Sequence, residues 1–333
     1  TAVENRQCAN FTDCFKSAAN MYYATDPVGL RYYSDCADLP YYLRAYFAFK
    51  NGLPFSFANG IAPLPGQNSR DVRYTSLGNM VTRRYDIATK LGAYGYPVYR
   101  DAVRVLNNIG DQISSANMRM IGDGDQDAVL YSDFYPAKLS RDGIHPGTVI
   151  YDPNGHVAVV YKVTDDGRIF YIDAHPDNSL TMGMYTPKFV RSNPGQGAGF
   201  KNFRPLQLVG AQSVDGELRG GQIVAAKNSE LPGYGVEQFY GTNPDPSGSW
   251  NKGTFVFRDQ AVDYYTYVRY ILTIGELHSD PLQDMKDLVA DICVSLHDRV
   301  PAVDSARTSE VQLKPHPERL PRSEEHTSEL QSH

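Results

Sequence analysis

The hydrophobic residues in the middle of the chain fall in short runs that are bounded by turn residues. Between residues 149 and 173, short runs rich in Val, Ile and Tyr are separated by the turn sequences Asp152-Pro153-Asn154-Gly155 and Asp165-Asp166-Gly167. This pattern predicts consecutive antiparallel strands over 149–151, 156–163 and 168–173. One more strand over 200–209 is expected to close the sheet.

Elsewhere the apolar residues recur at helical intervals and predict helices over 10–24, 38–50, 263–273 and 281–300, with weaker helical spacing over 100–118. Pro40 and Pro281 fall in first helical turns, where proline is tolerated. We expect the apolar stripe of the last helix, and Cys293 beside it, to be buried in the core. That stripe comprises Leu282, Met285, Leu288, Ile292 and Leu296. Strands and helices in this arrangement predict an α+β fold.

The first candidate for chemistry is Cys36. Because Pro40 restricts where its helix begins, the thiol lies at or just before the positive end of the helix dipole. That position, together with a cationic partner, lowers the pKa of a thiol and produces a nucleophile near neutral pH. Free cysteines are also often buried and inert, so the position alone does not decide between the two readings.

The second candidate is His156, which begins the second predicted strand. Asp173 ends the third strand, and a hairpin folded at Asp166-Gly167 brings the two ends side by side. A carboxylate there can hold the imidazole ring while the other ring nitrogen faces a thiolate. His175 lies two residues further, on the same strand face, and is the rival for the orienting role. The alternative is an ordinary surface histidine at a strand end.

These segments resemble a known family. Asp35-Cys36 opening a helix, Pro146-Gly147-Thr148-Val149-Ile150 followed by Gly155-His156-Val157-Ala158-Val159-Val160, and Tyr171-Ile172-Asp173-Ala174 are similar to the NlpC-type and CHAP-type cell-wall hydrolases of the papain-like superfamily. The resemblance covers roughly residues 22–61 and 143–175. It implies a papain-like core, with the helix-borne cysteine packed on an antiparallel sheet.

The resemblance also implies roles. Cys36 attacks a carbonyl, His156 carries the proton and Asp173 orients His156. The Cys36 backbone N–H and the Tyr23 side chain are the expected oxyanion donors, and no metal or organic cofactor is implied. The expected substrate is an amide bond in cell-wall peptides. Two alternatives stay open: a transglutaminase-like acyl transferase, and a catalytically silent protein that binds cell-wall polymer.

The chain departs from the family pattern in three respects. The usual Asp-Cys-Ser-Gly is Asp-Cys-Ala-Asp here, Asp173 stands where many members carry histidine, and 119 residues separate Cys36 from His156. We therefore interpret residues 52–141 as an inserted, partly helical cap within a catalytic domain of 1–210. Residues 211–321 are expected to form a mostly helical region that braces it. Residues 322–333 resemble a translated sequencing adapter and are set aside as an artefact.

The charge and the apolar runs of the sequence argue against nucleic acid as a partner and against a membrane span. The formal net charge is −6 and no basic cluster occurs, which argues against nucleic acid. No run approaches the roughly 20 apolar residues of a membrane span. The stretch 123–127 imitates a calcium loop, but Ala128 and Phe134 occupy the positions that need glycine and a carboxylate.

The four cysteines suggest a compartment. Cys8 and Cys14 are close enough to form a bridge under oxidising conditions, and their spacing does not suit zinc. The alternative is four reduced thiols. No charged and apolar leader precedes Thr1, as in a mature secreted chain or one trimmed at its start. We expect a secreted, periplasmic or cell-envelope protein.

Overall fold

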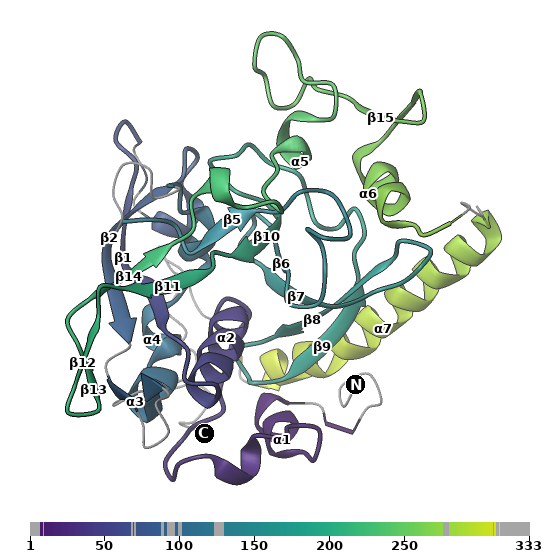
Figure 1. The fold of residues 1–333 in the computed structure, drawn as a ribbon. Coiled ribbons are helices and arrows are strands. Elements are labelled where there is room, and N and C mark those ends of the chain that lie inside the picture. The colour runs from purple at the N-terminus through teal and green to yellow at the C-terminus, as the bar shows by residue number, and fades with distance from the viewer. Residues whose placement is uncertain are drawn as a thin grey trace.

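The structure, a computed structural model, describes residues 7–8, 10–67, 69, 71–87, 90–91, 97–98, 102–122, 130–275, 280–308, 310 and 313. Its fold is mixed α/β, with several antiparallel sheets and few helices (Figure 1). The calcium-like stretch 123–127 and the adapter-like residues 322–333 lie outside the described residues.

A six-stranded antiparallel sheet forms the centre, in the order β5-β10-β6-β7-β8-β9. Three of the predicted strands are confirmed as β6, β7 and β8. The predicted strand over 200–209 is two strands: β10 lies between β5 and β6, and β11 (Leu206–Val209) pairs with β14 (Gln222–Ala225) in a separate sheet. The central strands are β5 (Phe134–Pro136), β6 (Val149–Tyr151), β7 (Val157–Val163), β8 (Ile169–Ala174), β9 (Leu180–Met184) and β10 (Gly199–Phe203).

The two faces of this sheet are covered differently. Side chains alternate along each strand, so Val157 and Val159 face α2 (Asp38–Lys50), while Ala158 and Val160 join the core shared with α6 (Tyr264–Leu272). The apolar side of α2 is therefore fixed against the strand that His156 precedes. This packing holds the N-terminal end of α2 close to the start of β7.

The N-terminal segment covers the outer side of α2. Its helix α1 (Phe11–Lys16) is shorter than the predicted 10–24 and is followed by a short 3-10 turn, η1 (Tyr23–Thr25). The rings of Phe11 and Phe15 pack edge-on against Tyr42, at centroid distances of 5.1 and 5.4 Å. The expected disulfide between Cys8 and Cys14 is present, which leaves Cys36 and Cys293 as free thiols.

The region interpreted as an insertion contains more strand than expected. Its main feature is the antiparallel pair of β1 (Phe55–Pro63) and β2 (Asn79–Ile87). The helical spacing over 100–118 becomes three short pieces, and β5, inside the range 52–141, is an edge strand of the central sheet. The other elements are η2 (Val72–Tyr74), β3 (Lys90–Leu91), β4 (Pro97–Val98), α3 (Ala102–Asn107), α4 (Ile109–Gln112) and η3 (Ser115–Arg119).

A buried ion pair ties this region to α2. Arg84 on β2 donates to Asp133 at 2.6 Å, and the same carboxylate accepts hydrogen bonds from the Tyr41 hydroxyl at 2.7 Å and the Ala58 backbone N–H at 3.0 Å. Buried charges are tolerated when they are paired and fully hydrogen-bonded, as here. The β1–β2 pair is thus fixed to the helix that carries Cys36 at its start.

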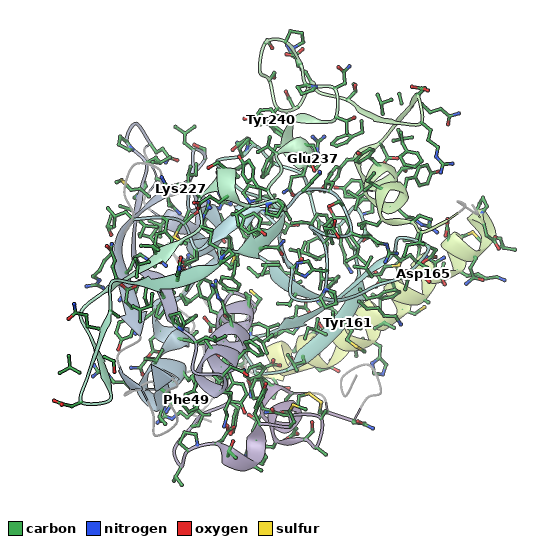
Figure 2. The ribbon with its side chains drawn as sticks, in the orientation of Figure 1. Phe49, Tyr161, Asp165, Lys227, Glu237 and Tyr240 are labelled. Atoms are coloured by element: carbon green, nitrogen blue, oxygen red, sulfur yellow. A yellow bond between two sulfur atoms is a disulfide. The ribbon has the colours of Figure 1, made fainter. Side chains whose placement is uncertain are left out.

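The C-terminal region combines small strand pairs with helices. Figure 2 labels Glu237 and Tyr240 on α5 (Glu237–Tyr240), and the Glu237 carboxylate accepts a hydrogen bond from the Leu139 backbone N–H. This contact joins α5 to the segment after β5. The remaining elements are β12 (Gln212–Val214), β13 (Glu217–Arg219), η4 (Asn228–Glu230), β15 (Phe255–Phe257), β16 (Gln260–Val262) and α7 (Pro281–Thr308).

The orientation predicted for the last helix is wrong. In α7, which follows the outer side of β9 (Figure 1), the apolar stripe is 44–60% exposed and Cys293 is also exposed. The acidic side faces the domain instead, because basic side chains of the domain pair with it. Within the described residues, no helix has the length and apolar character to cross a membrane.

Candidate active site

The thiol of Cys36 lies in the first turn leading into α2. The Asp35 side chain accepts hydrogen bonds from the backbone N–H groups of Ala37 at 2.9 Å and Asp38 at 3.1 Å, so Asp35 caps this turn. Within the described residues, no protein acceptor takes the Cys36 backbone N–H. The placement expected for Cys36, at the positive end of a helix, is confirmed.

Asp38 occupies the position where the family pattern has glycine. Its carboxyl group is 1% exposed, and its Oδ2 accepts a hydrogen bond from the Asp35 backbone N–H at 3.4 Å. Burial, followed by the nearby charge of Asp35, raises the pKa of Asp38 well above its ordinary value. Asp38 therefore accepts a hydrogen bond within the capping turn, and its negative charge is disfavoured there by burial and by Asp35.

The imidazole of His156 lies directly before β7. Gly155 precedes it with a φ of 106°, a left-handed conformation that favours glycine and turns the chain into the strand. The Cys36 Sγ donates to the Gly155 backbone oxygen at 3.9 Å, and the thiol is near enough to His156 to contribute to the raised pKa of that imidazole. The turn thus brings the thiol and the imidazole together.

Asp173, at the end of β8, holds the other side of the ring. The His156 Nε2 donates to the Asp173 Oδ2 at 2.6 Å, which leaves the Nδ1 side for Cys36. The Asp173 side chain is 7% exposed, whereas that of His156 is 38% exposed. A buried carboxylate thus orients a ring that substrate can reach.

The pKa values of His156 and Asp173 shift in opposite directions. Burial disfavours the charged form of His156, but the hydrogen bonds and charges of Asp173 and Cys36 outweigh burial and raise the pKa of His156 to about 10. Burial alone raises the pKa of Asp173, yet its hydrogen bonds to His156 and Thr181 lower it below its ordinary value. The pair is therefore held as imidazolium and carboxylate.

Two further side chains extend this arrangement. Thr181 lies opposite Asp173 in the β8–β9 register, and its hydroxyl donates to the Asp173 Oδ1. The His175 Nε2 donates in turn to the Thr181 Oγ1 at 2.9 Å. His175 thus contacts Asp173 through Thr181, and its ring centroid lies 6.2 Å from that of His156. The geometry gives Asp173, not His175, the direct contact with the imidazole.

Tyr23 is not joined to this group. Its side chain is 38% exposed, and its ring lies 6.1 Å from that of Tyr32. No hydrogen bond among the described residues links Tyr23 to Cys36, His156 or Asp173. The oxyanion role of Tyr23 stays a prediction from the resemblance.

The insertion supplies two hydroxyl groups next to the site. A Cβ atom at Gly155 would lie 3.6 Å from the Tyr74 hydroxyl and 3.8 Å from the Ser115 hydroxyl. Arg119, which is 2% exposed, fixes this neighbourhood: it donates to the backbone oxygens of Thr75 and Pro153. The turn before His156 is therefore attached to the segment that carries Tyr74.

The sequence did not single out Thr181, Tyr74 or Ser115. Thr181 follows from strand register, since an antiparallel hairpin from 169 to 184 places it opposite Asp173. Tyr74 and Ser115 come from irregular segments whose folding no periodic pattern indicates. Within the described residues, no group of three or more His, Cys, Asp or Glu side chains is arranged to hold a metal ion.

No protein-family model, no curated protein and no solved structure matches this chain. The chemical interpretation of the site therefore rests on its own geometry and on the resemblance of the short segments around Cys36, His156 and Asp173.

Proposed function

We propose that the chain is a papain-like cysteine hydrolase that cleaves an amide bond, with peptides of peptidoglycan as the substrate class. The observation that carries the proposal is the His156–Asp173 hydrogen bond of 2.6 Å beside the Cys36 thiol, which lies at a helix start and contacts the backbone oxygen of the residue before His156. A nucleophile, a base and an orienting carboxylate in hydrogen-bonding order are what thiol-based acyl chemistry requires.

The reaction divides into two halves. The Cys36 thiolate attacks the carbonyl carbon, and the amide bond breaks when the His156 imidazolium gives its proton to the leaving amine, leaving a thioester on Cys36. Neutral His156 then takes a proton from water as the water oxygen attacks the thioester. The carboxylic acid leaves and the Cys36 sulfur is released.

Negative charge on the carbonyl oxygen needs donors. The Cys36 backbone N–H supplies one, because it points from the first turn of a helix and has no acceptor within the described residues. Tyr23 is the second donor by resemblance, and Tyr74 is the rival by position beside Gly155. Tyr74→Phe and Tyr23→Phe distinguish them: the true donor loses about 10²–10³ in turnover, and the other variant keeps the wild-type rate.

The location and the substrate class belong to the same proposal. The Cys8–Cys14 disulfide supports an oxidising compartment, which suits a secreted or envelope-associated protein. The choice of cell-wall peptides rests on the resemblance to NlpC-type and CHAP-type enzymes. An inserted region that reaches Gly155 with Tyr74 and Ser115 supports a substrate groove bordered by the insertion.

One digestion tests the reaction and its alternatives. Purified peptidoglycan is incubated with the wild type and with Cys36→Ala, with and without a small primary amine, and the soluble products are weighed by mass spectrometry. We expect the wild type alone to release fragments with new free carboxyl and amino groups. Products that carry the added amine in place of water would instead indicate acyl transfer, and no products from a folded wild type would indicate a silent binding protein.

A further inference from the structure

Helix α7 carries an uncovered apolar seam. We define the α7 seam as Leu282, Met285, Val289, Ile292, Leu296 and Val303, whose side chains are 39–60% exposed. Apart from Arg299, which falls in the same series, the positions follow one another at alternating intervals of three and four residues. Such spacing is typical of two helices that pack knobs into holes, and monomeric proteins rarely expose an apolar surface of this length.

The acidic side of α7 is held to the rest of the domain by ion pairs between side chains. Asp284 accepts from Arg269 at 2.8 Å and from Arg168 at 3.2 Å. About two turns further, Asp291 accepts from the Met184 backbone N–H at 3.1 Å and pairs with Lys188 at 3.2 Å. At 100° per residue these carboxylates lie roughly 115–135° around the helix from the centre of the α7 seam. The rotation of the helix is thus set with the apolar side outward.

We propose that the α7 seam binds the α7 seam of a second copy of this chain. The residues that flank it carry a single charge among them, so two copies meet without like-charge repulsion. Partner choice in helix pairs is made by charges at these flanking positions, and their near absence favours self-pairing over a charged partner. The flanking residues are Lys286, Leu288, Cys293, Ser295 and Val300.

Arg299 determines the direction of the pair. It lies in the seam series, so a parallel pair in register places two Arg299 side chains against each other. In an antiparallel pair with Val289 opposite Ile292, Arg299 lies opposite Leu282 of the other copy, two residues from the exposed Asp280. That arrangement pairs opposite charges and also sets each helix C-terminus beside an N-terminus. We therefore infer an antiparallel two-helix contact.

Sedimentation velocity over a range of protein concentrations tests the proposal. We expect the full chain to form a dimer, Ile292→Glu to shift it to monomer, and the matched control Ala290→Glu to leave it a dimer. Ala290 is exposed on the same helix but lies outside the α7 seam. Circular dichroism confirms that each variant is folded, as expected for substitutions at exposed positions. A wild type that stays monomeric overturns the proposal, including one that instead sediments with anionic lipid vesicles. A dimer that survives Ile292→Glu, or one that Ala290→Glu disrupts equally, overturns it as well.

The antiparallel direction of the helix pair is tested by the distance between spin labels on the two copies. A spin label is placed at Leu282→Cys, at the end of the α7 seam, in a background of Cys36→Ala and Cys293→Ser, so that it is the only free thiol. With the pairing above, residue 282 lies opposite residue 299 of the other copy, an axial separation of about 26 Å between the two labels. Labels at close contact in a dimer would show a parallel pair and contradict the antiparallel assignment.

Discussion

The helices α2 and α7 begin alike and pack in opposite ways. Each has a proline in its first turn and apolar residues along its length. In α2 the apolar side faces Val157 and Val159 of the sheet, and the N-terminal end presents Cys36. In α7 the acidic side faces Arg168, Arg269 and Lys188, and the apolar side is exposed. Periodicity identifies a helix, but the chemistry of its neighbours decides which side is inward.

The difference has a functional meaning. A helix start held by a packed core can keep a thiol in register with an imidazole from another element. A helix held by exposed and half-exposed ion pairs gains only modest stability from them. We therefore expect variants at the start of α2 to affect chemistry strongly, and variants on α7 to affect assembly or local stability while leaving chemistry intact.

The largest expected effect is at the base. His156→Ala should lower turnover by at least about 10⁴-fold, because it removes the group that moves the proton. The fold should persist, since the His156 side chain is 38% exposed and precedes the strand. The measurement is the rate of peptidoglycan fragment release by a variant whose circular dichroism matches the wild type. Near-wild-type turnover in that folded variant rules out the dyad.

The orienting carboxylate should come next. Asp173→Ala leaves the His156 ring without its 2.6 Å partner, and losing such a partner costs up to about 10⁴-fold in turnover, mainly through the wrong tautomer. Asp173→Asn keeps an acceptor oxygen and should be impaired less. Turnover is measured for both variants at one pH. Equal loss in both would show that the charge, rather than the tautomer, is what matters.

His175→Ala is the matched control for Asp173. Since His175 reaches Asp173 only through the Thr181 hydroxyl, its removal should cost comparatively little turnover. A His175→Ala enzyme that is more damaged than Asp173→Ala would move the orienting role to His175.

Thr181 should have an intermediate effect. Thr181→Val keeps the shape but removes the donor to Asp173, and a hydrogen bond to a charged group contributes about 1.5–3 kcal/mol, or roughly 10–100-fold in rate if it is fully expressed. Thr181→Ser keeps the hydroxyl and should retain most of the activity. The pH dependence of turnover separates positioning from simple damage: we expect the acidic limb to shift in Thr181→Val only. An unshifted limb would leave Thr181 with a packing role.

On α7 the expected effect is on local stability. Asp284→Ala removes the carboxylate shared by Arg168 and Arg269, so hydrogen exchange of the α7 backbone should speed up several-fold while turnover stays unchanged. Asp304→Ala, at an exposed position of the same helix, is the control. High salt should reproduce the effect in the wild type. Unchanged exchange in Asp284→Ala would mean that α7 is held by something other than these ion pairs.

The smallest expected effect is on the pH dependence of the free energy of unfolding. The pKa of His156 is raised from 6.5 to about 10 on folding. Its contribution to the free energy of unfolding is therefore complete below pH 6.5 and is lost as the pH rises through about 10. The pKa of Asp173 is lowered, so its contribution is present above 3.8 and is lost as the pH falls. Because the His156 ring is part exposed, we expect the free energies of unfolding of the wild type and His156→Gln to differ by about 1 kcal/mol or less in urea near pH 6. The difference should vanish above about pH 10. A difference that grows with pH would contradict this assignment of charges.

Much of the candidate site was accessible from the sequence. Pro40 located the start of α2, and the turn residues around Gly155 and Gly167 located three strands, so the meeting of Cys36, His156 and Asp173 followed from local rules. Thr181 was missed because it depends on the register of the next strand, which the turn after His175 did not reveal. Tyr74 lies in an irregular segment, and only the packed structure brings it to Gly155.

The fold was less predictable where contacts between residues far apart in the chain determine the strand order or the orientation of a helix. The order of the strands could not be read from the sequence, since β10 inserts between β5 and β6 from far along the chain. The orientation of α7 was wrong for a related reason: the pairing of Asp291 with Lys188 joins residues far apart in the chain. An amphipathic pattern leaves open whether solvent, core or another molecule covers the apolar side.

The most direct test of the proposed chemistry is the alkylation rate of Cys36 as a function of pH. In a Cys293→Ser background the disulfide leaves Cys36 as the only free thiol, so iodoacetamide uptake reports on it alone. We expect rapid alkylation already near pH 6, reduced by orders of magnitude when His156 is replaced by alanine, because the imidazolium stabilises the thiolate. Slow alkylation at pH 6 that is the same with and without His156 would contradict an activated Cys36–His156 pair.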